Sequence, residues 1–247
     1  MNITGGTDIG SVRSANEDYY KIFKFDDNSF CAVVADGMGG HKGGKVASSV
    51  AASHIVDYIR TNISSIEITE ENVFAMLKKA IAEANELVYM RSLSDSELSG
   101  MGTTVVAVVY VDGVLYAANV GDSRIYEIGE SIRQISKDHS LVQDLIDKGV
   151  ITEAEANSHP NKNIITRAVG TEKNVETDTF RLDNLKNKHI LMCTDGLTNF
   201  VDDDTIAQIV KNHSSRTARD KLIELANENG GRDNITLIII DFDEVSR

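Results

Sequence analysis

The sequence predicts an α+β fold in which antiparallel β-sheets are covered by helices. Short apolar runs typical of strands follow one another across tight turns, and Asp112-Gly113 is a strong hairpin signal. Amphipathic segments long enough for helices fall into two blocks, one after the first strands and one before the last strand. A doubly wound parallel sheet would require regular alternation of strands and helices, so this order favours antiparallel sheets.

The first half of the chain begins with strands and continues with helices. Strands are expected at Met1–Ile9, Asp18–Phe25 and Phe30–Ala35. Helices are expected at Lys45–Thr61 and Glu70–Arg91, because apolar residues recur there at helical spacing. Thr69 supplies a hydroxyl that can cap the second helix.

The second half returns to strands and closes with two helices and a final strand. His139–Lys148 is expected to be a short helix that His139 caps and Gly149 stops. The polar segment Ile151–Thr171 is expected to be an irregular insertion or lid. The strands are expected at Thr103–Val111, Val114–Val120, Arg124–Ile128, Ile132–Ile135, Val175–Arg181, His189–Thr194 and Ile235–Asp241, and the closing helices at Asp202–Lys211 and Thr217–Asn229.

Length and charge limit the class of protein. The 247 residues contain no evident linker, so we expect a single domain over 1–247, and a net charge of −13 argues against a nucleic-acid partner. Cys31 and Cys193 lie inside expected strands, which favours reduced core thiols over a disulfide. Met1–Gly10 lacks the features of a secretion signal, and the longest apolar run is too short to span a bilayer. We therefore expect a cytoplasmic protein without membrane insertion.

Acidic residues follow or precede several of the expected strands. Two apolar runs end in Asp-Gly, at Asp36-Gly37 and Asp195-Gly196, and Asp-Gly is a turn signal that stops a strand. Asn16-Glu17-Asp18 and Asp233-Asn234 stand just before two other strands. A carboxylate held at the buried end of a strand loses solvation, which costs free energy unless a nearby positive charge offsets it. Each cluster alone fits an ordinary turn, but the four together predict divalent metal ions.

The glycine-rich stretch from Asp36 to Lys45 admits three interpretations. A phosphate-cradling P-loop fails because Val46 stands where a Ser or Thr should bind magnesium. A dinucleotide-binding fingerprint fails because Lys42 occupies the third glycine position. What remains is a metal-binding Asp36 whose glycine turn lets the Gly37 carbonyl approach the ion, or an ordinary turn that leads into a helix.

Three further residues are candidates for the site. Arg13 offers a planar fork for two phosphate oxygens. Asp122 is either an extra metal ligand at the same rim or, in a simple hairpin, the ion-pair partner of Arg124. His41 is either a proton donor near Asp36 or a surface histidine.

The motifs of the chain stand in a characteristic order and cover it nearly end to end. They resemble the metal-dependent protein serine/threonine phosphatases of the protein phosphatase 2C family, and most closely its compact bacterial members. The matching motifs are Arg13-x-x-Asn16-Glu17-Asp18, Asp36-Gly37-Met38-Gly39-Gly40-His41, Gly102-Thr103-Thr104, Gly121-Asp122-Ser123-Arg124, Asp138-His139-Ser140, Ile165-Thr166-Arg167-Ala168-Val169-Gly170, Thr194-Asp195-Gly196 and Asp233-Asn234.

The resemblance implies an αββα sandwich of two antiparallel sheets, with helices on both outer faces and metals in a cleft at one end. In the family pattern Asp36 bridges two ions, Asp195 and Asp233 complete one of them, and Gly37 contributes its carbonyl. The same pattern places two residues around the site mainly through bound waters, namely Glu17 and Asp18.

The resemblance also assigns the remaining candidates. Asp122 matches a position that can hold a third metal together with Asp195, and Arg13 matches the phosphate-binding arginine. The segment 141–167 matches a mobile flap near the substrate. Eukaryotic relatives carry a histidine, proposed as general acid, where this chain has Met38; His41 lies three residues further on, as in bacterial relatives.

The implied activity is hydrolysis of phosphoserine and phosphothreonine in proteins by a water that two ions activate. All-oxygen ligation suits Mn²⁺ or Mg²⁺, and ions that share one carboxylate lie about 3.5–4 Å apart. Phosphorylated proteins, including a serine/threonine kinase and its substrates, are the expected partners, and the enzyme is expected to be a monomer that opposes a bacterial kinase. The alternatives are a phosphatase dedicated to a sigma-factor regulator and a non-catalytic pseudophosphatase that binds a partner.

Overall fold

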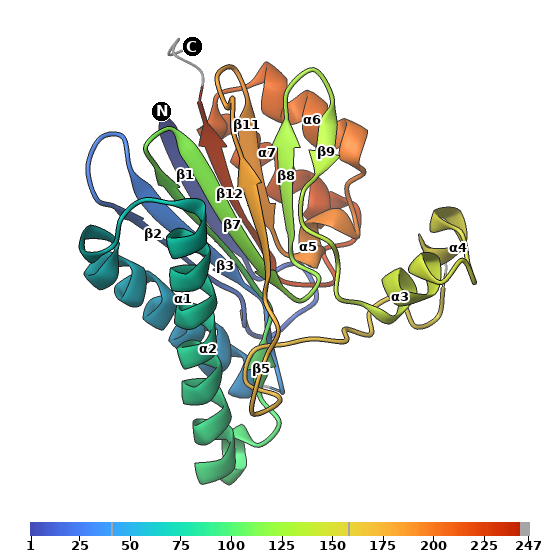
Figure 1. Cartoon of the computed structure of the whole chain (residues 1–247). Helices are drawn as coiled ribbons and strands as arrows, with labels where there is room; N and C mark the ends of the chain where they lie inside the picture. Colours follow the sequence, from blue (N-terminus) through green and yellow to red (C-terminus); the bar gives the residue numbers. More distant parts are fainter. Residues whose placement is uncertain (41, 158, 243–247) are drawn as a thin grey trace.

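The computed structural model describes residues 1–40, 42–157 and 159–242. Its strands form two five-stranded antiparallel sheets and one short two-stranded sheet. The larger sheets lie face to face and helices cover both outer faces (Figure 1), which confirms the predicted αββα sandwich.

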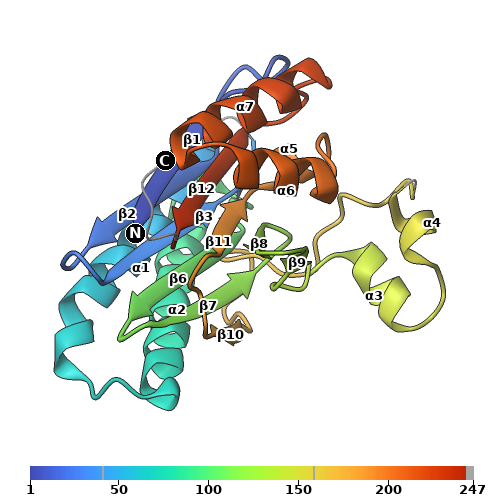
Figure 2. The same cartoon turned by 90° about the horizontal axis from the view of Figure 1, so that it is seen from above.

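Three helices cover the outer face of the first sheet (Figure 2). They are α5 (Asp195–Thr198), α6 (Asp203–Asn212) and α7 (Ser215–Glu228). Their apolar faces pack on the sheet, so that Val210 of α6 and Leu222 of α7 share one core cluster with Leu191 of the sheet. In spatial order the strands are β1 (Asn2–Asp8), β12 (Ile235–Asp241), β11 (His189–Cys193), β8 (Arg124–Ile128) and β9 (Ile132–Gln134).

Two long helices cover the outer face of the second sheet. They are α1 (Gly43–Asn62) and α2 (Glu70–Ser94), and Thr69 caps α2 as predicted by accepting a hydrogen bond from the Asn72 amide. The strands, in spatial order, are β10 (Asp178–Leu182), β7 (Val114–Val120), β6 (Val105–Val111), β3 (Phe30–Ala35) and β2 (Tyr19–Lys24), and β4 (Gly37–Met38) pairs with β5 (Gly102–Thr103).

Strand β3 shows why a continuous apolar run was needed. Its alternate residues Cys31, Val33 and Ala35 face α1 and α2, whereas Phe30, Ala32 and Val34 face the other sheet. Both faces of the strand are therefore buried, and a polar residue on either face would lose its solvation. Both cysteines are free and buried, as predicted.

The segment between β9 and β10 projects from the sandwich (Figure 2). It carries α3 (Leu141–Asp147) and α4 (Glu153–Asn157), and α4 was not predicted. Two backbone hydrogen bonds hold its base, from the Leu141 amide to the Ile164 carbonyl and from the Thr166 amide to the His139 carbonyl, both 2.8 Å. We call residues 141–167 the flap.

Three expectations about single elements were wrong. Ser140, not His139, caps α3, because the serine hydroxyl accepts the Gln143 amide. The expected strand Thr103–Val111 is interrupted at Thr104, whose amide bonds the Asp36 carbonyl outside the strand ladder. Asp195 begins the short helix α5 instead of a plain turn. Within the described ranges, no helix has an apolar stretch that could cross a bilayer.

Candidate active site

Strand ends from both sheets gather at one end of the sandwich. In the first sheet Cys193 pairs with both Arg124 and Leu237, so the end of β11 lies between the starts of β8 and β12. In the second sheet Tyr19 at the start of β2 pairs with Ala35 at the end of β3. The acidic residues that flank these strand ends are Asp18, Asp36, Asp122, Asp195 and Asp233.

The loops at this end enclose a cavity of about 650 Å³. Asp18 is not part of the lining; it is 7% exposed and accepts a 3.0 Å hydrogen bond from the Thr194 hydroxyl, which joins the two sheets. His41 lies outside the described residues. The other predicted site residues all line the cavity: Arg13, Glu17, Asp36, Gly37, Asp122, Asp195 and Asp233.

The backbone of Asp36 is fixed on both sides by two threonines. Its amide donates to the Thr104 hydroxyl at 3.1 Å, and its carbonyl accepts the Thr104 amide at 2.9 Å. The Thr103 hydroxyl donates to the same carbonyl at 2.8 Å. These bonds hold the carboxylate in place at the end of β3, so Thr103 and Thr104 are positioning residues.

The two Asp-Gly motifs need glycine because other backbone lies too close for a side chain. A Cβ on Gly37 would overlap the carbonyl oxygens of Gly44 and Glu17. A Cβ on Gly196 would overlap the carbonyl oxygen of Asn234. Each glycine therefore lets a carboxylate-bearing turn lie against a second loop of the site, which an ordinary solvent-exposed turn would not require.

Asn234 joins two loops of the site. Its side-chain oxygen accepts the Glu17 amide at 2.8 Å, and its nitrogen donates to the carbonyls of Ile9 at 2.9 Å and Ala15 at 3.0 Å. The residue is 5% exposed. Sequence reasoning noted Asn234 beside Asp233 but gave it no role; a buried amide with all these partners fixes the loop that leads to β2.

The carboxylates are buried beside one another, which opposes their ionisation. Burial raises the pKa of Asp18 to about 7 and that of Asp195 to about 6. Burial, and after it the charge of Asp195, raises the pKa of Asp122 to about 7. The pKa of Asp36 is raised well above its ordinary value, first by burial and then by Asp18 and Asp195. This crowding is unfavourable for a protein without a cation at the site.

The donor chemistry fits hard divalent ions. No hydrogen-bond donor among the described residues reaches Oδ1 of Asp18 or of Asp195, although both atoms are buried. Carboxylate and carbonyl oxygens are the ligands that Mn²⁺ and Mg²⁺ prefer. Within the described ranges no three His, Cys, Asp or Glu side chains already surround one point.

Arg13 lies at the mouth of the cavity. Its Nη2 contacts Oδ2 of Asp233 at 2.8 Å, and its Nε donates to the Arg232 carbonyl at 3.3 Å. The Arg13 side chain is 49% exposed. Asp233 thus aims the guanidinium beside the carboxylates while leaving part of it open to a ligand.

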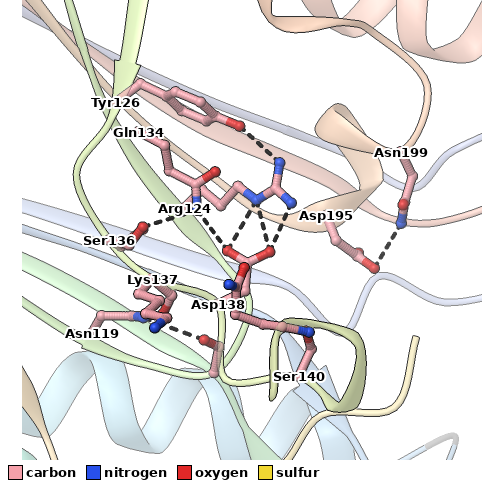
Figure 3. A network of polar contacts seen from close by, with 12 residues as sticks. Asn119, Arg124, Tyr126, Gln134, Ser136, Lys137, Asp138, Ser140, Asp195 and Asn199 are labelled. Carbon is pink, nitrogen blue, oxygen red and sulfur yellow. Dashed lines mark hydrogen bonds and ion pairs between the residues drawn. The ribbon is translucent and has the colours of Figure 1, made fainter. Parts of the chain in front are cut away.

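Arg124 pairs with Asp138, which corrects the hairpin interpretation that paired it with Asp122. Its Nε lies 3.0 Å from both Asp138 oxygens and its Nη2 lies 2.7 Å from one of them. Its Nη1 donates to the Tyr126 hydroxyl at 2.9 Å, and Gln134 also donates to Asp138 (Figure 3). Both oxygens of Asp138 therefore accept hydrogen bonds from Arg124 or Gln134. Asp122 is not the partner of Arg124 and lines the cavity.

His139 connects the Asp122 turn to the base of the flap. The Gly121 amide donates to its Nδ1 at 3.0 Å, so the ring carries its proton on Nε2, which faces Asp178 at 3.2 Å. Burial lowers the pKa of His139, which favours this neutral form. Arg167 donates to the same Asp178 at 3.1 Å. Sequence reasoning missed this role because Asp178 and Gly121 are far from His139 along the chain.

Comparison with known proteins gives a consistent result. Residues 6–228 match the family described as Protein phosphatase 2C. The chain is 41% identical over 241 residues to the serine/threonine phosphatase stp of Listeria monocytogenes, with 96% of this chain and 94% of that protein covered. The solved structure of Stp1 from Staphylococcus aureus is 36% identical with a TM-score of 0.87, covering 97% of this chain and 94% of that one. The catalytic domain of the phosphatase PstP, in complex with two manganese ions, is 30% identical with a TM-score of 0.83, and 97% of each chain is covered.

Proposed function

The chain belongs to the protein phosphatase 2C family, and we propose that its cavity removes phosphate from phosphoserine and phosphothreonine side chains of proteins. The observation that carries this proposal is the convergence of carboxylates from both sheets on one cavity with Arg13 at its mouth. Residues 1–247 would form one catalytic domain.

The carboxylates fall into three roles in this proposal. Asp36, Asp195 and Asp233, with the Gly37 carbonyl, would hold two divalent ions. Glu17 and Asp18 would act through bound waters, and Asp122 with Asp195 would form a third position. A structural relative contains two manganese ions, and Mg²⁺ has the same ligand preference. When bound, the ions supply the activation of a water for attack on phosphorus and part of the neutralisation of the phosphate charge.

The chain's own residues bind and orient the substrate. Arg13 would hold two phosphoryl oxygens and offset the charge that develops on them. Thr103 and Thr104 hold the backbone of Asp36, and Asn234 holds the loop that contains Glu17. These bonds fix the positions of the site residues, so little reorganisation is needed during the reaction. His41, outside the described residues, is our candidate for giving a proton to the leaving serine or threonine oxygen.

We propose that the partners are phosphorylated proteins, including a serine/threonine kinase and its targets, and that the enzyme acts as a cytoplasmic monomer. A dedicated sigma-factor regulator is the finer alternative for the substrate. Asp18, Asp36 and Asp195 argue against a non-catalytic binding module, which has no reason to retain buried charges that destabilise it. Asp233, the fourth carboxylate expected of an active enzyme, is also present and lines the cavity.

The direct test is hydrolysis of a phosphothreonine peptide with Mn²⁺, with Mg²⁺ and with EDTA. We expect phosphate release that depends on the divalent ion and that Asp195→Asn reduces by about 10²-fold or more, since one ligand and one charge are lost. Release that persists in EDTA, or wild-type protein that binds Mn²⁺ but releases no phosphate, would contradict the proposal.

Arg13→Ala should lower kcat/KM for the same peptide by about 10²-fold, because a bidentate contact to the phosphoryl group is lost. Arg13→Lys should recover only part of this, since an ammonium cannot contact two oxygens as a planar fork does. Because Arg13 also pairs with Asp233, the substitution could weaken activity by displacing that proposed metal ligand. Mn²⁺ affinity, measured by titration calorimetry, distinguishes the two causes: it should be unchanged if only the phosphate contact is lost. An unchanged kcat/KM in Arg13→Ala would remove the assigned role.

A further inference from the structure

A second cavity, of about 690 Å³, adjoins the catalytic one. The two share a wall that includes Asp122, Asp195, Asn199 and Phe200. The rest of the second cavity is lined by the flap on one side and by the start of α6 on the other. A polypeptide whose phosphorylated side chain enters the catalytic cavity would therefore place neighbouring residues at the second one.

The rim of the second cavity is acidic beyond the needs of the proposed metal site. Glu153 comes from the flap, and Asp202 and Asp203 from the start of α6. Hydrogen bonds from the Thr205 amide and hydroxyl lower the pKa of Asp202, so it is ionised near neutral pH.

Cations in the described lining do not balance these charges. There are two of them, Arg124 and Lys162. Nε and Nη2 of Arg124 both donate to the Asp138 carboxylate (Figure 3), so Arg124 and Asp138 together contribute no net charge. Lys162 lies on the border with the catalytic cavity, since it lines both. The part of the second cavity away from the catalytic one is thus left with excess negative charge.

Apolar side chains complete the lining of the cavity. Val142 and Ile146 come from α3, and Phe200 and Val201 from the loop between α5 and α6. An apolar surface beside carboxylates fits a side chain with a long aliphatic stem and a cationic end, as in lysine and arginine. An acidic substrate side chain would meet like charges there, which opposes binding.

We propose that the second cavity binds the polypeptide beside the phosphorylated residue and selects a lysine or arginine there. The inference rests on the proposed function and names the substrate class within it: phosphoproteins with a basic residue close to the phosphorylated one. Extended chain advances about 3.3–3.6 Å per residue, so a residue within a few positions of the phosphothreonine reaches an adjoining cavity.

The test uses a matched pair of charge reversals. Asp203 and Asp204 are consecutive residues in the first turn of α6, but only Asp203 is part of the cavity lining. The substrates are pairs of phosphothreonine peptides that differ only in having Lys or Glu at one of the three positions on either side of the phosphothreonine. The control substrate is p-nitrophenyl phosphate, which is too small to reach the second cavity.

At one or more positions the wild type should hydrolyse the Lys peptide with a kcat/KM about fivefold above that of the Glu peptide, mainly through KM. Asp203→Lys should abolish or invert this preference, and Glu153→Lys on the facing wall should act in the same direction. Asp204→Lys should keep the preference, and p-nitrophenyl phosphate hydrolysis should be unchanged in all three variants.

Equal rates on Lys and Glu peptides, or identical behaviour of Asp203→Lys and Asp204→Lys, would overturn this inference and leave the phosphatase function intact, because p-nitrophenyl phosphate is still hydrolysed. Failure of the wild type on every substrate, p-nitrophenyl phosphate included, would instead overturn the proposed function and this inference with it.

Discussion

Asp36→Asn will reduce phosphatase activity by about 10³-fold or more and will raise the melting temperature of the metal-free protein. Activity falls because the one carboxylate assigned to both ions is lost. Stability rises because burial, Asp18 and Asp195 together make ionisation of Asp36 unfavourable, and an amide of the same shape removes that charge. Opposite changes in activity and stability are the expected signature of a buried charge kept for function.

Asp138→Asn is the matched control for this experiment. Asp138 lies near the same cavity, but Arg124 and Gln134 satisfy its oxygens, so the substitution breaks a partnered network and should lower the melting temperature. Both variants are measured in EDTA at pH 8 by differential scanning calorimetry, and activity is measured with Mn²⁺. Near wild-type activity in Asp36→Asn, or a melting temperature that falls as in Asp138→Asn, would contradict the assignment of Asp36.

The sequence specified most strand boundaries because the signals that set them are local. Apolar runs, Asp-Gly turns and the Asp112-Gly113 hairpin lie within a few residues of the elements that they determine. The same signals placed carboxylates at strand ends. Because the end of an antiparallel strand lies beside the start of its neighbour, pairing within each sheet brings Asp36 near Asp18 and Asp195 near Asp233. Which end of one sheet meets which end of the other depends on how the two sheets pack.

Features that depend on partners distant in sequence could not be predicted in this way. Arg124 is two residues from Asp122 yet pairs with Asp138, because the β8–β9 hairpin brings that carboxylate to its guanidinium. Asn234 acts on loop atoms more than two hundred residues away in sequence. The choice of partner is a tertiary property, and neither residue type nor spacing encodes it.

The melting temperature of the metal-free protein will fall as pH rises from about 5 to 8. In the unfolded chain these aspartates titrate near pH 4, whereas burial raises the pKa of Asp18 and Asp122 to about 7 and that of Asp195 to about 6. Between these values the folded state binds more protons than the unfolded state, so raising the pH costs stability. One pKa unit corresponds to about 1.4 kcal/mol and shifts the melting temperature of a chain of this size by about 3–6 °C.

Mn²⁺ should reverse this dependence, because the ion binds the ionised carboxylates and protons compete for the same oxygens. At 100 times its dissociation constant a ligand of the folded state adds about 2.7 kcal/mol, so the gain in melting temperature at pH 8 should be about 5 °C or more. The gain should shrink at pH 5.5, and Asp36→Asn should show both a weaker pH slope and a smaller Mn²⁺ effect.

A metal-free protein that becomes more stable from pH 5 to 8 and does not respond to Mn²⁺ would show that these carboxylates are neither crowded nor a metal site. The pH slope in EDTA and the Mn²⁺ shift report on the same buried charges without any catalytic assay, so they test the site independently of the substrate.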